Sequence, residues 1–218
     1  TDALGLAPVD PADLGAEWAA LAGDTPTVTL ESELPGAVAL ITPDNEALGR
    51  ALARRSLEEY RGGTVLLLDC LPENTGVRAR VEAAEAALIR GGATVLRWSE
   101  TGEEELARLD EAGSLAQVVA LEAGTTERAA EIKERSGSGA ALYGVGVTGR
   151  IAAWLERGTI SAVAAWSEYA AGYLAVQQAV GAAGEKTEPL TGTLPFSVVG
   201  GDEIYEPEYQ KLLFPVTS

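Results

Sequence analysis

The sequence contains no histidine, no methionine and a single cysteine, Cys70, in 218 residues. The absence of histidine removes the most versatile general base and the commonest zinc ligand. A lone cysteine excludes an internal disulfide and a thiolate metal cluster. These absences exclude a Ser-His-Asp triad, zinc-dependent hydrolysis and thiol redox cycling within the chain, and we expect no catalytic residue, no metal and no cofactor.

Basic residues are also scarce, since 16 lysines and arginines stand against 33 aspartates and glutamates, which gives a formal charge of -17. Binding to nucleic-acid phosphates depends on a surplus of cationic side chains that displaces counterions. The charge therefore argues against nucleic acid as a ligand of this segment. The 46% of hydrophobic residues are enough for a real core.

Long apolar runs are missing as well, because no stretch reaches the roughly 18 residues that a membrane-spanning helix needs. The chain begins at Thr1 without a basic start or an apolar leader. We expect either that an N-terminal part has been removed or belongs to a longer precursor, or that an initiator methionine is not written. The sequence alone leaves both alternatives open.

Short apolar runs rich in Val, Leu and Thr alternate with segments of helical spacing, a pattern typical of parallel sheets covered on both faces. Strands are predicted over 3–8, 27–31, 37–42, 64–69, 94–98, 117–121, 141–146, 161–165 and 192–199. Helices are predicted over 11–21, 44–61, 76–90, 103–112, 125–136, 149–157 and 168–183. The tail from Gly200 is interpreted as irregular.

One glycine motif resembles a dinucleotide-binding fingerprint. Gly144, Gly146 and Gly149 form a G-x-G-x-x-G directly after a predicted strand and before a predicted helix, and Glu168 follows at the spacing of a ribose carboxylate. The motif normally opens a nucleotide domain, whereas several βα units precede it here. A tight strand-to-helix turn, in which glycine allows a sharp bend, is the alternative that we favour.

Read from end to end, the order of segments resembles the type I periplasmic binding proteins, the family of ribose-binding protein and of lac-repressor-type effector domains. The most specific passage is Gly158 to Val163 followed by Tyr169 to Val176, which is similar to the family signature "G-x-I-x-A-T, then Gly-Tyr-x-Ala". Four earlier passages also match in order and spacing: 2–11, 25–31, 42–45 and 71–80.

The resemblance implies an α/β fold with two lobes, each a parallel sheet flanked by helices, and a ligand held in the cleft between them. The N-terminal lobe is expected to comprise 1–43 and 167–190, and the C-terminal lobe 44–166 and 191–218. The family normally has two further βα units before the passage that resembles Thr1 to Pro11. We therefore expect the N-terminal lobe to be incomplete in this chain.

Site residues follow from the same resemblance, position by position. Glu31 stands at the acid of the N-terminal lobe, where a carboxylate accepts sugar hydroxyls, and Ser32 replaces its usual basic neighbour. Arg80 stands at the arginine that reaches the ligand, with Arg78 at an alternate position. Asn74 lies in the preceding loop, as a source of further polar contacts.

Three further positions depart from the family pattern. Glu122 stands where sugar binders often carry an asparagine, Gly146 where a ligand aspartate is common, and Trp166 where an amide is common. These departures make a ribose-like site improbable and favour a pocket with an aromatic ring and an acid. Trp166 filling the hinge as a packing residue is the equal alternative.

The resemblance implies a non-enzymatic solute-binding protein that captures a small polar ligand, a sugar or a related metabolite, for an ABC permease or a membrane sensor. It would act outside the cytoplasm, in the periplasm or as a cell-surface lipoprotein. The alternative is the cytoplasmic effector-binding domain of a lac-repressor-type regulator. An NAD-binding enzyme domain, based on the glycine motif, is a further alternative from a different class.

Overall fold

The structure is a computed structural model that describes residues 2–99, 103–184 and 193–214. Within these residues the chain separates into two compact units. Unit 1 comprises 1–45, 71–78 and 167–195, and unit 2 comprises 46–70, 79–166 and 196–218. The predicted N-terminal lobe did not include 71–78, a segment that hydrogen bonds from Asn74 to Pro8 and from Thr75 to Ser32 attach to unit 1.

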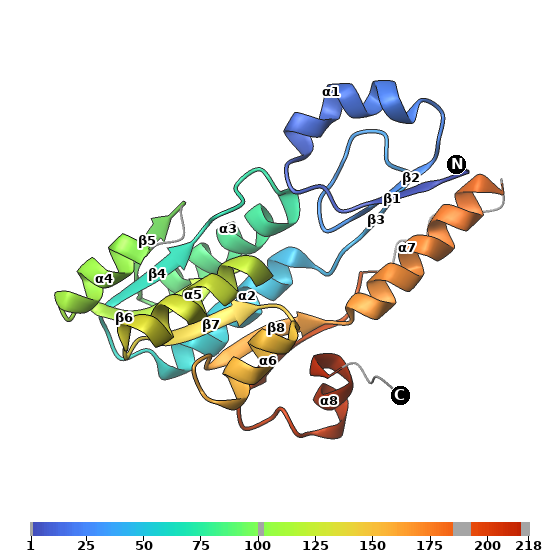
Figure 1. The fold of residues 1–218 in the computed structure, drawn as a ribbon. Coiled ribbons are helices and arrows are strands. Elements are labelled where there is room, and N and C mark those ends of the chain that lie inside the picture. The colour runs from blue at the N-terminus through green and yellow to red at the C-terminus, as the bar shows by residue number, and fades with distance from the viewer. Residues whose placement is uncertain (1, 100–102, 185–192, 215–218) are drawn as a thin grey trace. The chain divides into compact units, whose positions relative to one another are not determined.

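Unit 1 is built on a three-stranded parallel sheet of β1 (Leu4–Leu6), β2 (Thr27–Leu30) and β3 (Ala39–Ile41), in that order. Helix α1 (Pro11–Ala22) connects β1 to β2, as a parallel pair requires. Helix α7 (Glu168–Ala183) packs against all three strands (Figure 1). The expected α/β organisation of this unit is confirmed.

Unit 2 contains a six-stranded sheet in the order β5-β4-β6-β7-β8-β9. Its strands are β4 (Thr64–Leu68), β5 (Thr94–Trp98), β6 (Leu115–Ala120), β7 (Ala141–Val145), β8 (Ala162–Trp166) and β9 (Phe196–Gly200). The last strand pairs antiparallel with β8, whereas the other pairs are parallel. The start of the predicted strand at Gly192 lies outside the described residues.

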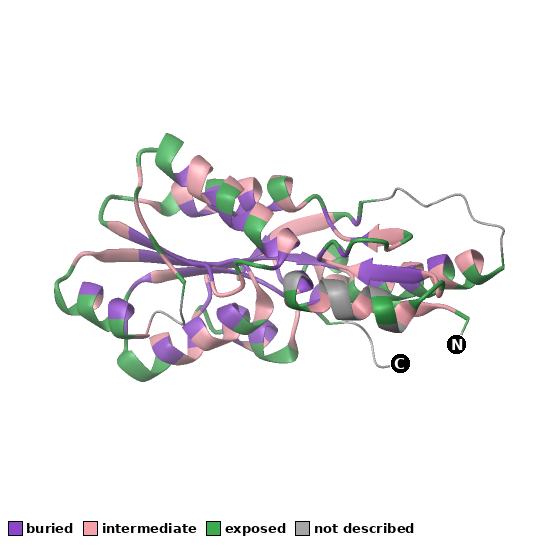
Figure 2. Cartoon of the chain, turned by 90° about the horizontal axis from the view of Figure 1, so that it is seen from above, coloured by how far each residue is buried: buried purple, intermediate pink, exposed green. Residues whose placement is uncertain are grey.

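Helices cover both faces of this sheet, which Figure 2 shows edge-on between helical layers. One layer contains α4 (Glu103–Glu111), α5 (Ala123–Ser136) and α6 (Gly149–Glu156), which share a buried apolar cluster with alternate strand residues such as Leu66, Val118 and Val163. The other layer contains α2 (Asn45–Glu59) and α3 (Thr75–Arg90). Burial on both faces explains why the strands are continuous apolar runs.

The tail was interpreted as irregular, and that interpretation was wrong for α8 (Pro207–Leu213). Pro207 occupies the first turn of α8, where its missing N–H costs nothing. Leu213 is buried, and Tyr209 and Leu212 pack against the cluster of unit 2. Tertiary packing therefore forms a helix that the acidic, proline-containing sequence did not indicate.

No helix among the described residues combines the length and apolar character needed to cross a bilayer.

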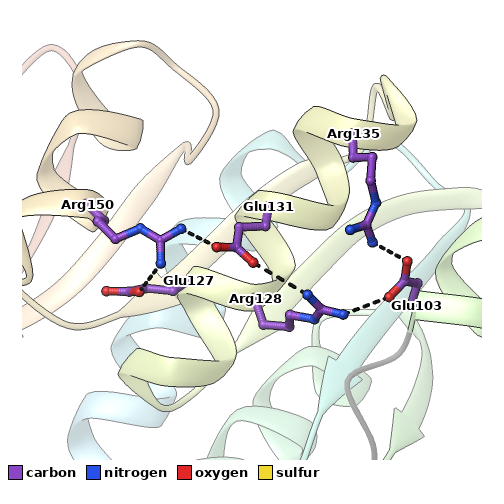
Figure 3. Close-up of polar contacts among 6 residues, drawn as sticks. All are labelled: Glu103, Glu127, Arg128, Glu131, Arg135 and Arg150. Atoms are coloured by element: carbon purple, nitrogen blue, oxygen red, sulfur yellow. Dashed lines mark hydrogen bonds and ion pairs between the residues drawn. The ribbon is translucent and has the colours of Figure 1, made fainter.

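Six residues of alternating charge link the helices of one layer, in the order Arg135, Glu103, Arg128, Glu131, Arg150 and Glu127 (Figure 3). Arg128 of α5 lies 2.9 Å from Glu103 of α4, and Arg150 of α6 lies 3.0 Å from Glu127 of α5. Arg150 also pairs with Glu131. The hydrogen bond from Arg150, followed by its charge, holds the pKa of Glu131 below its usual range.

This lowered pKa predicts how the network responds to acid. Because the folded-state pKa of Glu131 is lowered, its contribution to stability is present above about pH 4.3, the usual glutamate pKa, and is lost as the pH falls further. We expect Arg150→Gln to lower the melting temperature at pH 7, with a smaller difference from wild type at pH 3. Thermal melts across pH measure this, with Arg50→Gln, whose arginine belongs to a separate exposed pair with Glu46, as the control. A difference that stays constant with pH would contradict it.

Helices α2 and α3 approach each other closely at Gly49. A methyl group at this buried position would stand 2.2 Å from the carbonyl oxygen of Arg80, a distance that no backbone tolerates. We expect Gly49→Ala to destabilise the protein by roughly 1–3 kcal/mol through overpacking. Denaturant unfolding measures the loss, and Gly149→Ala in α6, where the added carbon meets nothing within 4 Å, is the matched control. Equal stability of the two variants would contradict the close approach.

Candidate ligand-binding site

The candidate site lies at the carboxyl ends of the parallel strands of unit 2. The chain places β5 on one side of β4 and β6 on the other, so the strand order reverses between β4 and β6. In open α/β sheets, ligands bind outside the carboxyl ends of the strands at such a reversal. Leu121 and Glu122 follow β6 there, Gly146 follows β7, and Trp166 ends β8.

Arg80 reaches across this edge from the second turn of α3. Its Nη1 donates a hydrogen bond of 3.3 Å to the carbonyl oxygen of Leu121. Its guanidinium carbon lies 4.7 Å from the centre of the Trp166 ring, which is a cation-π distance. Arg80 is 1% exposed, so the carbonyl and the ring partly replace the hydration of its charge.

Trp166 is 8% exposed at the end of β8, opposite Phe196 of β9. The ring is therefore largely covered, and it lies against the guanidinium of Arg80. The sequence left open whether Trp166 is a packing residue or a binding residue, and a ring in this position can be both. Together Arg80, Trp166 and the Leu121 carbonyl form a polar and aromatic group at the sheet edge.

Glu122, predicted as a ligand acid, is the N-cap of α5. Its two carboxylate oxygens accept hydrogen bonds from the backbone N–H of Gly124 at 2.7 Å and of Thr125 at 2.8 Å. The hydroxyl of Thr125 donates a third bond at 3.0 Å. Three donors within the protein thus engage the carboxylate that the sequence assigned to a ligand.

The glycine motif is explained by contacts within the fold. Gly146 has φ +131°, and an added Cβ would stand 2.7 Å from Ile151 and 2.9 Å from Ala123. A Cβ on Gly144 would stand 2.3 Å from the methyl carbon of Thr126. The turn and the close packing of helices on the sheet therefore require glycine at both positions without a cofactor.

The polar residues of unit 1 bond chiefly to its backbone. Asn74 is buried, donates from Nδ2 to the carbonyl oxygen of Pro8 at 3.1 Å, and accepts at Oδ1 from the N–H of Val77 at 3.0 Å. The hydroxyl oxygen of buried Ser32 accepts from the N–H of Thr75 at 3.0 Å. Both side chains fix the first turn of α3 beside β2.

Glu31 follows β2 with a positive φ of 64°, an uncommon conformation for a residue with a side chain. Its carbonyl oxygen lies so close to α3 that a Cβ on Gly76 would stand 2.3 Å away. Desolvation first, and the neighbouring charge of Glu31 second, raise the pKa of Glu168. Arg78 is exposed and belongs to unit 1, whereas Arg80 belongs to unit 2.

The sequence analysis missed Asp69 at the end of β4. This buried carboxylate accepts from Arg97 of β5 at 2.7 and 3.0 Å through Oδ2, while its Oδ1 has no hydrogen-bond partner among the described residues. An aspartate directly after an apolar strand was the available signal. Cys70 beside it is half-buried, and desolvation raises the pKa of its thiol.

The family model described as "Periplasmic binding protein domain" matches residues 1–187. The chain belongs to the periplasmic binding protein family. The resemblance stated from the sequence is thereby confirmed, and so is the fold class of type I members, with parallel sheets flanked by helices. Members of this family typically bind ligands without catalysis.

Solved structures of periplasmic binding proteins share this fold at low identity. An ABC transporter solute-binding protein from Agrobacterium vitis, with bound D-fucose, is 16% identical with a TM-score of 0.83 over 98% of this chain and 80% of that one. A carbohydrate transporter solute-binding protein from Agrobacterium radiobacter, in complex with D-arabinose, is 16% identical with a TM-score of 0.87 over 97% and 78%.

A structure from Bacteroides fragilis, assigned to the LacI transcriptional regulators, is 14% identical with a TM-score of 0.80 over 93% of this chain and 76% of that one. No curated protein sequence gives a significant match. These similarities show the fold alone.

The geometry of Glu122 predicts a structural effect of its removal. Glu122→Ala deletes the acceptor for the first backbone donors of α5, and we expect a loss of about 1–2 kcal/mol in the free energy of unfolding. Urea titration of the variant measures it. Glu104→Ala, which removes an exposed glutamate from the first turn of α4, serves as the control. A loss no greater than in the control would show that the cap contributes nothing.

Proposed function

We propose that the chain is a solute-binding protein that captures a small polar ligand, a sugar or a related metabolite, at the carboxyl edge of the six-stranded sheet. The observation that carries the proposal is the guanidinium of Arg80, which lies 4.7 Å from the centre of the Trp166 ring at the carboxyl edge of the six-stranded sheet. A planar guanidinium offers a fork of donors that matches adjacent hydroxyls, and an aromatic ring packs on the apolar face of a sugar.

The other polar groups narrow the chemistry of this edge. The carboxylate of Glu122 is engaged by three donors of α5, so Arg80 is the charged side chain on which ligand recognition depends. A buried arginine favours ligands that offer oxygen acceptors. Hydroxyl-rich neutral molecules and small carboxylates meet this requirement, whereas ammonium compounds do not.

Arg80 is 1% exposed, so a ligand reaches its donors only after a change in conformation. A ligand shifts a conformational equilibrium only to the extent that it binds one state more tightly than the other. The protein would therefore report ligand by changing shape, as an ABC permease or a membrane sensor requires. In this proposal the protein acts outside the cytoplasm, as most solute-binding members of the family do.

The alternative is the effector domain of a cytoplasmic LacI-type regulator, favoured by the structural similarity to the Bacteroides fragilis protein. The two functions differ in cellular location and in the residues encoded upstream of Thr1. A leader with a lipobox cysteine supports export, whereas a basic helical headpiece supports DNA binding. Fractionation of cells that produce the native protein separates the two outcomes.

Titration calorimetry tests the ligand class directly. We expect a sugar from a panel that includes D-fucose and D-arabinose to bind, and Arg80→Lys to weaken this binding at least about tenfold, since lysine keeps the charge but loses the planar fork. Arg90→Lys, at the exposed far end of the same helix, is the matched control.

Two results would count against the proposal. If neither the sugars nor the small polar metabolites give a heat of binding, the proposed ligand class is wrong. If Arg80→Lys leaves the affinity unchanged, and circular dichroism shows that both variants are folded, the proposed site is wrong. The proposed ligand class would still stand.

A further inference from the structure

Asp69, directly after β4, carries a carboxylate whose two oxygens differ in their bonding. Its side chain is 6% exposed. Oδ2 accepts hydrogen bonds from Arg97, at 2.7 Å from Nη2 and at 3.0 Å from Nε. Oδ1 is buried as well, yet it accepts no hydrogen bond from the residues that the structure describes. Because a buried acceptor without a partner is destabilising, this oxygen requires an explanation.

Two neighbouring elements hold the carboxylate of Asp69 in one orientation. Arg97 of β5 bonds Oδ2 with two of its nitrogens, and its Nη1 donates to Glu85 of α3 at 3.2 Å. The backbone N–H of Asp69 donates to the carbonyl oxygen of Trp98 at 2.7 Å. A guanidinium is planar and only donates, so it keeps Oδ2 turned toward itself. Oδ1 is the oxygen that remains for a donor from elsewhere.

Asp69 lies next to the loop that Arg80 contacts. Leu68 pairs with Ala120 in the sheet, so the residues that follow them, Asp69 and Leu121, lie side by side at the ends of β4 and β6. The carbonyl oxygen of Leu121 accepts the hydrogen bond from Arg80. The strand order reverses between β4 and β6, where ligands bind in open α/β sheets. Asp69 therefore belongs to the same edge as the candidate site.

The side chain of Asp69 also lies on the same face of the sheet as the candidate site. Leu68 and Ala165 belong to the apolar cluster shared with α4, α5 and α6. Because successive side chains of a strand point to opposite faces, Asp69 and Trp166 point to the other face, which α2 and α3 cover. Arg80 approaches the edge from α3 on this face. The three side chains thus share one face of one sheet edge within unit 2.

The chemistry of the two charged groups restricts the ligand. The guanidinium of Arg80 only donates hydrogen bonds, whereas Oδ1 of Asp69 accepts them. A ligand that satisfies both must offer an acceptor and a donor, and a hydroxyl group offers both. An ionised carboxylate satisfies Arg80 but has no proton for Oδ1, and its charge is repelled by that of Asp69.

We propose that Oδ1 of Asp69 accepts a hydrogen bond from a ligand hydroxyl and thereby selects hydroxyl-rich neutral molecules over small carboxylates. This inference rests on the proposed function and narrows its ligand class. Oδ1 is covered, as Arg80 is, so a ligand reaches it only after the change in conformation already inferred. A site built to bond a hydroxyl discriminates strongly against analogues without one, because its buried polar group is then left unpaired.

Asp69→Asn tests the inference, with titration calorimetry of D-fucose and D-arabinose against pyruvate and succinate. Because Arg97 only donates, it holds the oxygen of the new amide, and the amide nitrogen takes the place of Oδ1. A charged acceptor is thus replaced by a neutral donor. We expect weaker sugar binding and stronger carboxylate binding, so that the ratio of sugar affinity to carboxylate affinity falls at least about tenfold.

Glu85→Gln is the matched control, since it removes the same charge from the other partner of Arg97 without placing a donor beside Arg80. We expect it to change the ratio less than about threefold. A merely structural role of Asp69 would weaken the binding of sugars and carboxylates alike and leave the ratio unchanged.

The outcomes separate this inference from the proposed function. Wild-type protein that binds pyruvate or succinate more tightly than either sugar overturns the inference but leaves the proposed function standing, and this comparison needs no variant. A ratio that Asp69→Asn leaves unchanged, or that Glu85→Gln lowers equally, also overturns it, provided circular dichroism shows both variants folded. If none of the four probes binds, the inference fails together with the ligand class of the proposed function.

Discussion

Every helix that follows a parallel strand begins with backbone N–H groups that have no partner inside the helix, and these groups must be bonded. The structure meets this requirement with side chains at the strand ends. Glu122 caps α5, Asn74 caps α3, Thr148 caps α6 and Ser167 caps α7. The edge that we propose for the ligand is also the edge where these caps are needed. Polar residues there are consequently divided between holding the helices and meeting a ligand.

Arg80 is a polar residue at this edge that caps no helix. It lies in the second turn of α3, beyond the donors of the first turn, so its side chain takes no part in capping. Its guanidinium instead reaches the Leu121 carbonyl, at the point where the chain leaves β6 and turns into the helix capped by Glu122. The arginine and the cap thus fix the same loop from two sides. In the proposed site Glu122 would act indirectly, by holding this loop through its bonds to Gly124 and Thr125.

The order of strands and helices could be predicted because a sheet that is buried on both faces needs strands that are apolar runs. The helices that cover it need apolar residues at helical spacing. The antiparallel pairing of β9 could not, since an apolar run such as 196–200 has the same composition in either direction. Helix α8 was missed because its formation depends on contacts of Leu212 and Leu213 with residues that are distant in the sequence. Sequence reasoning proposed Arg80 and Trp166 for the site but not their contact, which joins positions far apart in the chain. The predicted helix over 76–90 already implied that Arg78, two positions before Arg80, points to a different side, and Arg78 is exposed.

The charge of the chain is distributed in a way that composition hides. In unit 2, opposite charges on α4, α5 and α6 neutralise one another in pairs across helices, as in the contacts of Arg128 and Arg150. Such exposed pairs contribute little stability individually, but they allow a helix to face solvent without an apolar surface. On the outer face of α7 the charged residue is Glu168, in the first turn. The helices of unit 2 thus face solvent through ion pairs, whereas the outer face of α7 is typical of a surface that other protein groups cover.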